Sequence, residues 1–216
     1  MTDAHCHLSA GDGRIREFVI GVGFLGVHPW ESSEWTPGRL AELRAALTAD
    51  AHLGVGEIGL DRLKAREIPP AMREAFESQL ALAFEFARPC VLHGAKCWGQ
   101  VVAAVRRTGE RLSLPVPPCL FHGFSRSDGL LPDIRALGGF VSVDPAVLND
   151  HAVNYRRLVR SIPPECLLIE TDRTAESAAE CPPLAAVARA VAEIRGVSVS
   201  EIEKLTDVNA ERFCSP

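Results

Sequence analysis

Short apolar segments alternate with longer segments of helical periodicity along the whole chain. The apolar segments predict seven β-strands, over residues 2–7, 18–27, 53–56, 90–93, 119–122, 140–143 and 167–170. Most of them are apolar at consecutive positions, which is typical of strands that are covered on both faces and not of one-sided antiparallel strands.

Helices are predicted between these strands. The clearest helical period runs from Met72 to Ala87, where apolar residues recur every three or four positions. Further helices are predicted over 40–47, 101–105, 130–137, 153–159, 183–195 and 200–213. The last of them opens with Ser200 and Glu203, which have the spacing of a capping box.

Alternation of strands and helices predicts a parallel sheet with right-handed crossovers, in an α/β fold. Seven strands are one fewer than a complete (β/α) barrel requires. Either the eighth strand lies within the first 30 residues or the barrel is incomplete. No stretch has the composition of a linker, so residues 1–216 are expected to form a single barrel-like domain.

The composition is that of an ordinary globular protein, with 47% hydrophobic and 24% charged residues. No apolar run approaches the roughly 20 residues that a membrane span needs, so no membrane partner is expected. The first residues, Met1 to His5, are neither basic nor strongly apolar, which argues against a secretory signal. The expected location is therefore the cytoplasm.

The cysteines and the net charge argue against two further classes of protein, zinc- or disulfide-stabilised domains and proteins that bind long nucleic acid by charge alone. The seven cysteines are scattered without a C-x-x-C pair and are predicted to be reduced, with none of them a structural zinc ligand. The net charge of −5, from 23 basic and 28 acidic residues, argues against binding long nucleic acid by bulk electrostatics. A metal site that binds one or two phosphates stays open, since the ions supply the positive charge.

Polar residues end several of the predicted strands. Because the carboxyl ends of parallel strands gather at one mouth of a barrel, these residues are expected to converge there. The converging set holds four imidazoles and two carboxylates, which are ligands of divalent transition metals. Its members are His5, His7, Glu57, His93, His122 and Asp172.

Each of these residues also has a structural interpretation. His5 and His7 point to the same side of a strand, and they could bind one ion or be a hydrogen-bonded polar pair in the barrel. The other two histidines could be satisfied core residues, Glu57 an acid at a helix N-terminus and Asp172 an N-cap. Six such residues at strand ends favour the metal site.

With their neighbours, these residues resemble the motifs of TatD-like hydrolases. The matching segments occur in the order seen in that family: 3–8 (DAHCHL), 26–29 (GVHP), 54–61 (GVGEIGLD), 91–93 (VLH), 121–125 (FHGFS), 168–172 (LIETD) and 209–213 (NAERF), with Gln79 in a helix similar to the family's F-x-x-Q-L helix. The resemblance covers nearly the whole chain. It implies a TIM-type barrel of the metal-dependent hydrolase superfamily, divalent cations, and nuclease or phosphodiesterase activity on DNA ends.

The resemblance also implies roles for the candidate ligands. His5, His7 and Asp172 would bind one ion, and His93 and His122 the second. Glu57 would bridge the two ions, and Asp172 would additionally accept the proton of the attacking water as a general base. Four histidines favour Zn²⁺, Mn²⁺ or Fe²⁺ over Mg²⁺, although the identity of the metal stays open.

Three departures from the family pattern concern the substrate side. The interval from His7 to Gly26 is short, the usual H-x-R-D/E-A becomes HGAKCW at 93–98, and the proline and hydrophobic residues after the last acid become RTA at 173–175. Lys96 is the candidate that replaces the missing arginine as a phosphate contact. His28 is a candidate for contacting the substrate or fixing a ligand, with a loop-capping histidine as the alternative.

Three functions remain open at this point. The leading one is a hydrolase of phosphodiesters, with a small phosphoester or a nucleic-acid end as substrate. A second keeps the metals and changes the bond to an amide, lactone or aminoacyl ester. A third is a catalytically idle barrel that serves as a binding protein. Asp61 and Arg62 line the mouth or form a solvated pair, and Trp30 either stacks on a base or packs over the rim.

Overall fold

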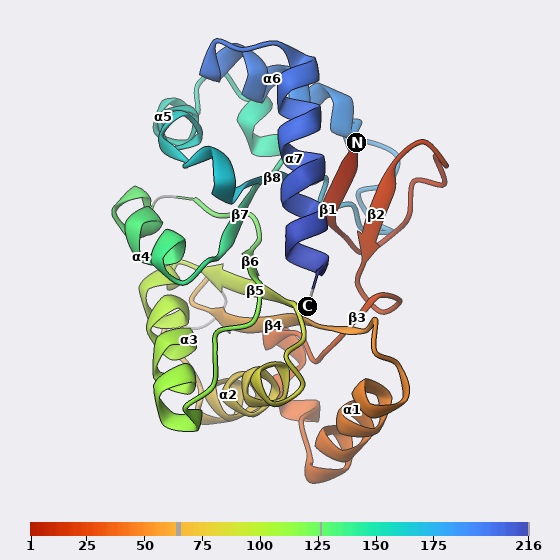
Figure 1. Cartoon of the computed structure of the whole chain (residues 1–216), viewed down its shortest axis with the longest axis vertical. Helices are drawn as coiled ribbons and strands as arrows, with labels where there is room; N and C mark the ends of the chain where they lie inside the picture. Colours follow the sequence, from red (N-terminus) through yellow and green to blue (C-terminus); the bar gives the residue numbers. More distant parts are fainter. Residues whose placement is uncertain (64–65, 126, 216) are drawn as a thin grey trace.

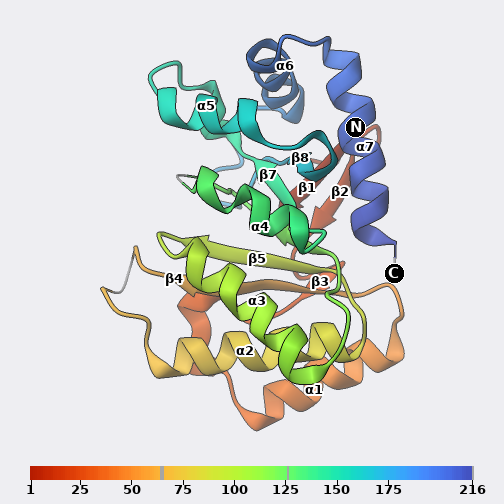
Figure 2. The same ribbon diagram turned by 60° about the vertical axis from the view of Figure 1, so that its left-hand side comes forward.

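Within the part of the chain that the structure describes, eight parallel strands surround the interior, and helices cover their outer faces (Figure 1; Figure 2). This computed structural model describes residues 1–63, 66–125 and 127–215. The strands are β1 (Thr2–Cys6), β2 (Arg16–Val19), β3 (Phe24–Leu25), β4 (Gly54–Asp61), β5 (Cys90–Ala95), β6 (Cys119–Phe121), β7 (Phe140–Val143) and β8 (Leu167–Ile169). The α-helices are α1 (Pro37–Ala49), α2 (Pro70–Glu85), α3 (Trp98–Leu112), α4 (Leu131–Ala136), α5 (Val153–Ser161), α6 (Leu184–Arg195) and α7 (Val199–Cys214).

The strands are hydrogen-bonded as two parallel sheets. Strands β3 to β8 form a six-stranded sheet in sequence order, and β1 pairs with β2. The chain after β8 closes the gap to β1, where the amide of Asp172 donates to the carbonyl of His5 at 3.1 Å and the amide of His7 donates to that of Arg173 at 2.8 Å. The fold is therefore an α/β, TIM-type barrel in which the hydrogen bonds between neighbouring strands do not run all the way round. This agrees with the expectation of an incomplete barrel.

The eighth strand lies within the first 30 residues, where the sequence had predicted one continuous strand over 18–27. That segment instead contains β2, a turn and the two-residue strand β3. Gly21 adopts φ +85°, a backbone conformation that residues with a Cβ rarely adopt. The amides of Val22 and Gly23 both donate to the carbonyl of Val19, at 3.2 and 3.1 Å, so the chain turns where a strand was expected.

The predicted helices form, with one correction to a helix start. The capping box of α7 is made by Ser198 and Glu201, two residues before the predicted pair Ser200 and Glu203. Gly196 ends α6 in the left-handed conformation, so only two residues are needed before α7 begins. Ser200 therefore falls inside the first turn of the helix, where it has no role as an N-cap.

The interior of the barrel begins with an apolar layer at the amino ends of the strands. Alternate residues of a strand point to opposite faces, so one set packs beneath the helices and the other points inward. The inward set forms a cluster of its own, made of Ala4, Phe18, Phe24, Val91, Leu120, Phe140, Leu168, Ala210 and Phe213. The last two belong to α7, and the fully buried ring of Phe213 stacks on Phe24 with 5.8 Å between ring centroids.

Polar residues follow this apolar layer along the same strands. His93 lies two positions after Val91, and His122 lies two positions after Leu120. The strand period of two therefore places both imidazoles inward, at the carboxyl end of the barrel. None of the described helices is both long and apolar enough to span a lipid bilayer.

Candidate metal centre

The six predicted ligands converge at the carboxyl ends of the strands, as expected. His5 lies in β1, Glu57 in β4 and His93 in β5. His122 directly follows β6, and the other two members of the set follow β1 and β8. Residues from five strands thus meet in one group, and the group is centred on the buried carboxylate of Glu57.

Each oxygen of Glu57 faces a different pair of histidines. Oε1 lies 2.6 Å from Nδ1 of His93 and 2.6 Å from Nε2 of His122. Oε2 lies 3.2 Å from Nε2 of His7 and 3.5 Å from Nε2 of His5. The carboxylate therefore stands between two sets of nitrogen donors.

Asp172 completes the side of the centre formed by the β1 histidines. Its Oδ1 lies 3.4 Å from Nε2 of His5 and 3.7 Å from Nε2 of His7. The residue adopts φ +49°, and its amide is held by the carbonyl of His5. A non-glycine residue in the left-handed region costs conformational energy, and such positions concentrate at functional sites.

The two predicted substrate contacts lie on different sides of the centre. Nε2 of His28 is 3.4 Å from Oε1 of Glu57, while its Nδ1 accepts the amide hydrogen of Trp30 at 3.1 Å. The capping interpretation of His28 is confirmed, since it caps the 3₁₀ helix η1 (Pro29–Glu34); it also faces the centre, and its contact with substrate stays a prediction. Lys96 is exposed and lines a cavity next to the centre.

Asp61 lies beside the centre at the carboxyl end of β4. The alternative of a solvated pair with Arg62 is wrong for Asp61, because its side chain is buried. Its Oδ2 lies 3.0 Å from Nε2 of His93 and accepts the indole hydrogen of Trp30 at 2.7 Å. Because β4 extends to Asp61, four residues past Glu57, the strand alternation places both acids on the inward face.

Glu170 is a residue of the site that the sequence analysis did not single out. Its buried Oε1 accepts the amide hydrogen of Gly123 at 2.7 Å and lies 3.6 Å from Nδ1 of His122. Its Oε2 accepts the hydroxyl hydrogen of Ser142. The signal was present in the sequence, because Glu170 stands two positions after the inward-facing Leu168.

The centre is strongly polarised. Burial disfavours the charge on Glu57, but the charge of His122 and hydrogen bonds from His122, His28 and His7 outweigh it and hold the pKa of Glu57 well below its ordinary value. The pKa of His122 is raised well above its usual value, because Glu57 and Glu170 outweigh the cost of burying the charge. The hydrogen bond to Glu57 likewise raises the pKa of His7.

The arrangement of donors fits divalent cations. Both ring nitrogens of the fully buried His5 have no hydrogen-bond partner among the described residues, although two carboxylate oxygens lie near its Nε2. A buried polar nitrogen without a partner is costly, and a cation would satisfy it. Three overlapping groups have all their donor atoms within 4.8 Å of one another: His5, His7 and Glu57; His5, His122 and Asp172; and His28, Glu57 and His93.

We expect metal binding to weaken as the pH falls. The raised pKa values of His7 and His122 favour the protonated rings in the metal-free protein, and an ion that binds these rings must displace the proton. Isothermal titration calorimetry with Zn²⁺ in buffers of different ionisation enthalpy should show proton release, and the affinity should rise from pH 6 to pH 8. An affinity that is constant over this range, without proton release, would contradict the assignment of these histidines.

A parallel barrel with this imidazole and carboxylate cluster at its carboxyl mouth defines the class of metal-dependent hydrolases. The family model described as TatD related DNase matches residues 15–215. The chain belongs to that family and is a TatD-like metal-dependent hydrolase.

Curated relatives of the chain include nucleases. The 3'-5' ssDNA/RNA exonuclease TatD of Edwardsiella piscicida is 32% identical over 148 residues, which are 68% of this chain and 55% of that protein. The match therefore spans about half the length of that relative. The protein of the same name from Klebsiella pneumoniae (strain 342) is 29% identical over 85% of this chain and 73% of its own. The uncharacterized metal-dependent hydrolase YabD of Bacillus subtilis is 25% identical over 92% of this chain and 79% of its own.

Solved structures of similar fold support the barrel. YJJV, a TatD homolog from Escherichia coli k12, superposes with a TM-score of 0.79 at 21% identity, covering 99% of this chain and 97% of that one. A TatD family hydrolase from Entamoeba histolytica gives a TM-score of 0.73 at 17% identity, over 92% of this chain and 75% of that one. At these identities the likeness concerns the fold.

Proposed function

We propose that the protein is a two-metal hydrolase that cleaves phosphodiester bonds, with nucleic-acid ends as substrate. The observation that carries this proposal is the position of Glu57, whose two oxygens face two separate pairs of histidines. Family membership and the exonuclease names of the curated relatives support the choice of bond. A carboxylate between the ions favours phosphoesters modestly, since amide-cleaving relatives often use a modified lysine there.

The ligands divide around Glu57. We assign His5, His7 and Asp172 to one ion and His93 and His122 to the other, with Glu57 in contact with both. When bound, divalent ions would polarise a phosphoryl oxygen and lower the pKa of water. Zn²⁺, Mn²⁺ or Fe²⁺ suits four imidazoles better than Mg²⁺ does.

The acids Glu57 and Asp172 have different roles in the proposed reaction. Glu57 has a pKa well below its ordinary value and stays ionised over the working pH range, so it holds charge and position. Asp172 is nearly half exposed, with a side-chain accessibility of 46%, and borders the cavity at the centre. It is therefore the acid best placed to accept the proton that the attacking water loses.

Substrate binding is assigned to residues on both sides of the centre. The cavity over the ligands has a volume of about 550 Å³ and is bordered by His28 and Trp30. A neighbouring cavity of about 710 Å³ is bordered by Lys96, and it shares His93 with the first. We assign Lys96 to the phosphate and His28 to the substrate or to Glu57, which its Nε2 already faces.

The decisive experiment is a matrix of metals and substrates on metal-stripped protein. Zn²⁺, Mn²⁺, Fe²⁺ and Mg²⁺ would each be tested against bis(p-nitrophenyl) phosphate, short oligonucleotides, aryl esters and anilides. The proposal predicts metal-dependent hydrolysis of the phosphodiesters. Turnover of esters or amides alone would exclude the phosphodiesterase, and less than one tightly bound or restorable metal per chain would favour a binding protein.

We expect Asp61→Asn to weaken metal binding. Oδ2 of Asp61 faces Nε2 of His93 and so directs Nδ1 of the same ring toward Glu57. Loss of such an outer carboxylate typically costs about 10- to 100-fold in metal affinity. A competition titration with a chelating dye measures the change, and Asp133→Asn, an exposed acid paired with Arg106, is the control. An affinity that is equal in the two variants would rule out the positioning role.

A further inference from the structure

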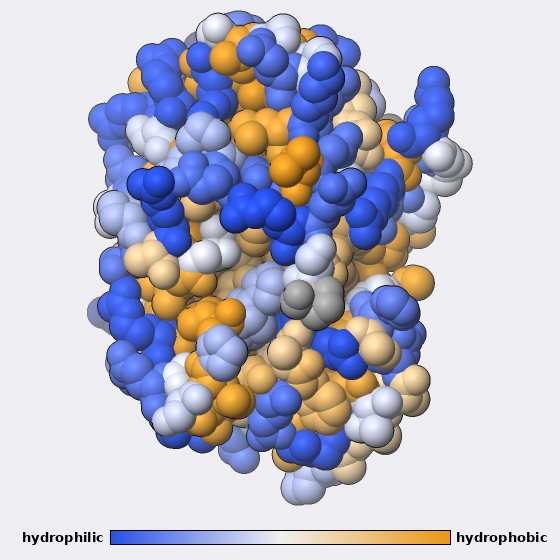
Figure 3. Space-filling view, viewed as in Figure 1, coloured by the Kyte–Doolittle hydropathy of each residue, from blue (hydrophilic) through white to orange (hydrophobic). Residues whose placement is uncertain are grey.

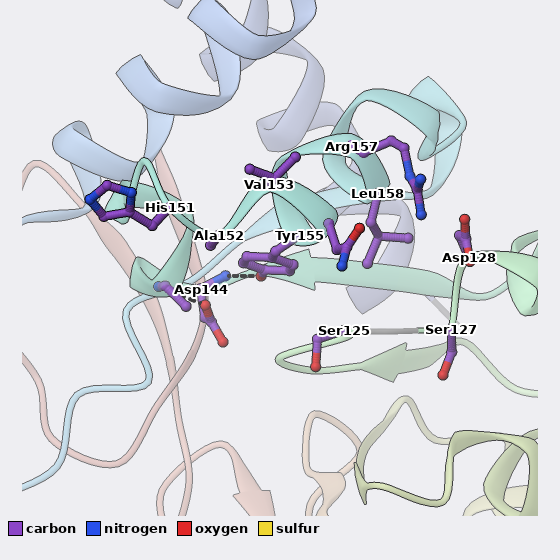
Figure 4. A pocket seen from close by; sticks show the side chains of 12 residues that line it. Ser125, Ser127, Asp128, Asp144, His151, Ala152, Val153, Tyr155, Arg157 and Leu158 are labelled. Carbon is purple, nitrogen blue, oxygen red and sulfur yellow. Dashed lines mark hydrogen bonds between the residues drawn. The ribbon is translucent and has the colours of Figure 1, made fainter.

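A polar recess lies beside the metal centre, between the end of β7 and helix α5 (Figure 4). Its volume is about 820 Å³. Ser125 and Ser127 line it from the segment after β6, and Asn154 and Arg157 line it from α5. These side chains belong to none of the three donor groups of the metal centre.

The recess adjoins the metal centre through residues that it shares with the cavity between them. Ser125, Ser127 and Asp144 border both the recess and the cavity that holds Lys96. That middle cavity shares His93, His122 and Asp172 with the cavity over the centre. The three hollows therefore adjoin one another in a row from Trp30 past the metal ligands to Arg157, and we call this row the groove.

The floor of the recess is fixed, while its α5 wall offers unengaged donors. The buried hydroxyl oxygen of Tyr155 accepts the amide hydrogen of Asp144 at 3.0 Å, and Oδ1 of Asp144 accepts the amide hydrogen of Ala146 at 2.8 Å. By contrast, Arg157 is exposed, and none of the described acids lies within ion-pair distance, 4.0 Å, of its guanidinium. Its planar group is thus available for an oxyanion.

The charge of the recess suits one phosphate. Arg157 is the cation of the α5 wall, and the side-chain amide of Asn154 and the hydroxyls of Ser125 and Ser127 can donate hydrogen bonds. Two acids also line the recess, Asp128 across from Arg157 and Asp144 at its floor (Figure 4), so the positive charge is confined to the α5 wall. One phosphodiester group of a strand can therefore lie against Arg157, whereas a further phosphate placed at the acids would be repelled.

We propose that Arg157 binds the phosphate of a neighbouring nucleotide while the bond to be cleaved lies at the metal centre. The inference rests on the proposed function, and it adds that the substrate is a strand of several nucleotides and not a mononucleotide or a small ester. Ser125 and Ser127 line the path between the two phosphates. A small phosphodiester would fill only the cavities at the centre and would not reach Arg157.

The test is the length dependence of hydrolysis. We would measure kcat/KM for oligodeoxynucleotides of two to six nucleotides and for bis(p-nitrophenyl) phosphate, with the metal-loaded protein and Arg157→Ala. The wild type should prefer the longer strands. Arg157→Ala should lower kcat/KM for them by about fivefold to tenfold, as expected for one charged phosphate contact. It should also reduce the slope of log(kcat/KM) against log(salt concentration) by about 1. Hydrolysis of bis(p-nitrophenyl) phosphate should be unchanged.

Arg107→Ala is the matched control. Arg107 is an exposed arginine on α3, 3.7 Å from Glu77 and outside the groove, so its loss should not change the length dependence. Equal kcat/KM values for all lengths in the wild type would overturn the subsite, and so would an equal loss in Arg157→Ala for strands and for bis(p-nitrophenyl) phosphate. If no phosphodiester is hydrolysed at all, the proposed function itself fails, and this outcome is distinct from the other two.

Discussion

Glu57→Ala is expected to lower turnover of phosphodiesters by at least about 1,000-fold, which corresponds to about 4 kcal/mol of transition-state stabilisation. Both oxygens of this carboxylate face histidine donors, and one of them lies 2.6 Å from two rings. Its removal takes a shared ligand from both halves of the centre. We therefore expect both the activity and the metal content to fall.

The measurement combines steady-state kinetics with metal analysis and circular dichroism. The fold should persist, because loss of Glu57 removes the largest of the interactions that raise the pKa of His122, and a neutral ring can remain in the barrel. Glu57→Gln preserves the shape and should also lose activity, whereas Glu77→Ala on the surface of α2 should not. Full unfolding of both Glu57 variants would assign the residue a structural role, and unchanged turnover would remove it from the centre.

Removal of the metals should abolish activity and lower the melting temperature by about 8–16 °C. An ion at 1,000 times its dissociation constant adds about 4 kcal/mol to the free energy of unfolding. For a domain of this size, each kcal/mol corresponds to roughly 2–4 °C. The buried rings of the centre, His5 above all, would lose the partner that satisfies their nitrogens.

Differential scanning fluorimetry after dialysis against a chelator measures this change, and titration with Mn²⁺, Zn²⁺ or Mg²⁺ should restore both the melting temperature and the activity. The melting temperature of Glu57→Gln should rise less on addition of metal than that of the chelated wild type. A melting temperature that is identical with and without metal, in a protein that is active in both states, would refute the metal centre.

The convergence of the candidate ligands could be predicted from the sequence, because the carboxyl ends of all strands of a parallel barrel meet at one mouth. His5, Glu57, His93 and His122 follow apolar segments, so their convergence required only the topology. The division of these donors between two ions was implied by family resemblance, and the overlapping donor groups of the structure leave it a prediction.

Asp61 and Glu170 were harder to predict, because their roles depend on contacts between different strands. Asp61 acts on His93 across the β4–β5 pair, and Glu170 holds the segment of Gly123 from the end of β8. The prediction of a single strand over 18–27 was wrong because the chain turns at Gly21, and the apolar pattern alone does not reveal this turn. The groove toward Arg157 depends on how α5 packs beside β7, and no sequence motif marks it, so it could not be predicted from the sequence.

The ring of Phe213 stands at the amino ends of the strands, opposite the imidazole layer. With the other apolar residues of this layer, it closes the amino end of the barrel, so the metal centre is reached from the carboxyl end. Substrate and water must enter, and both products must leave, through this one opening. A cleaved fragment therefore has to dissociate or move along the groove before the next bond reaches the centre. The turnover rate should thus depend on how firmly the walls of the groove hold the departing piece.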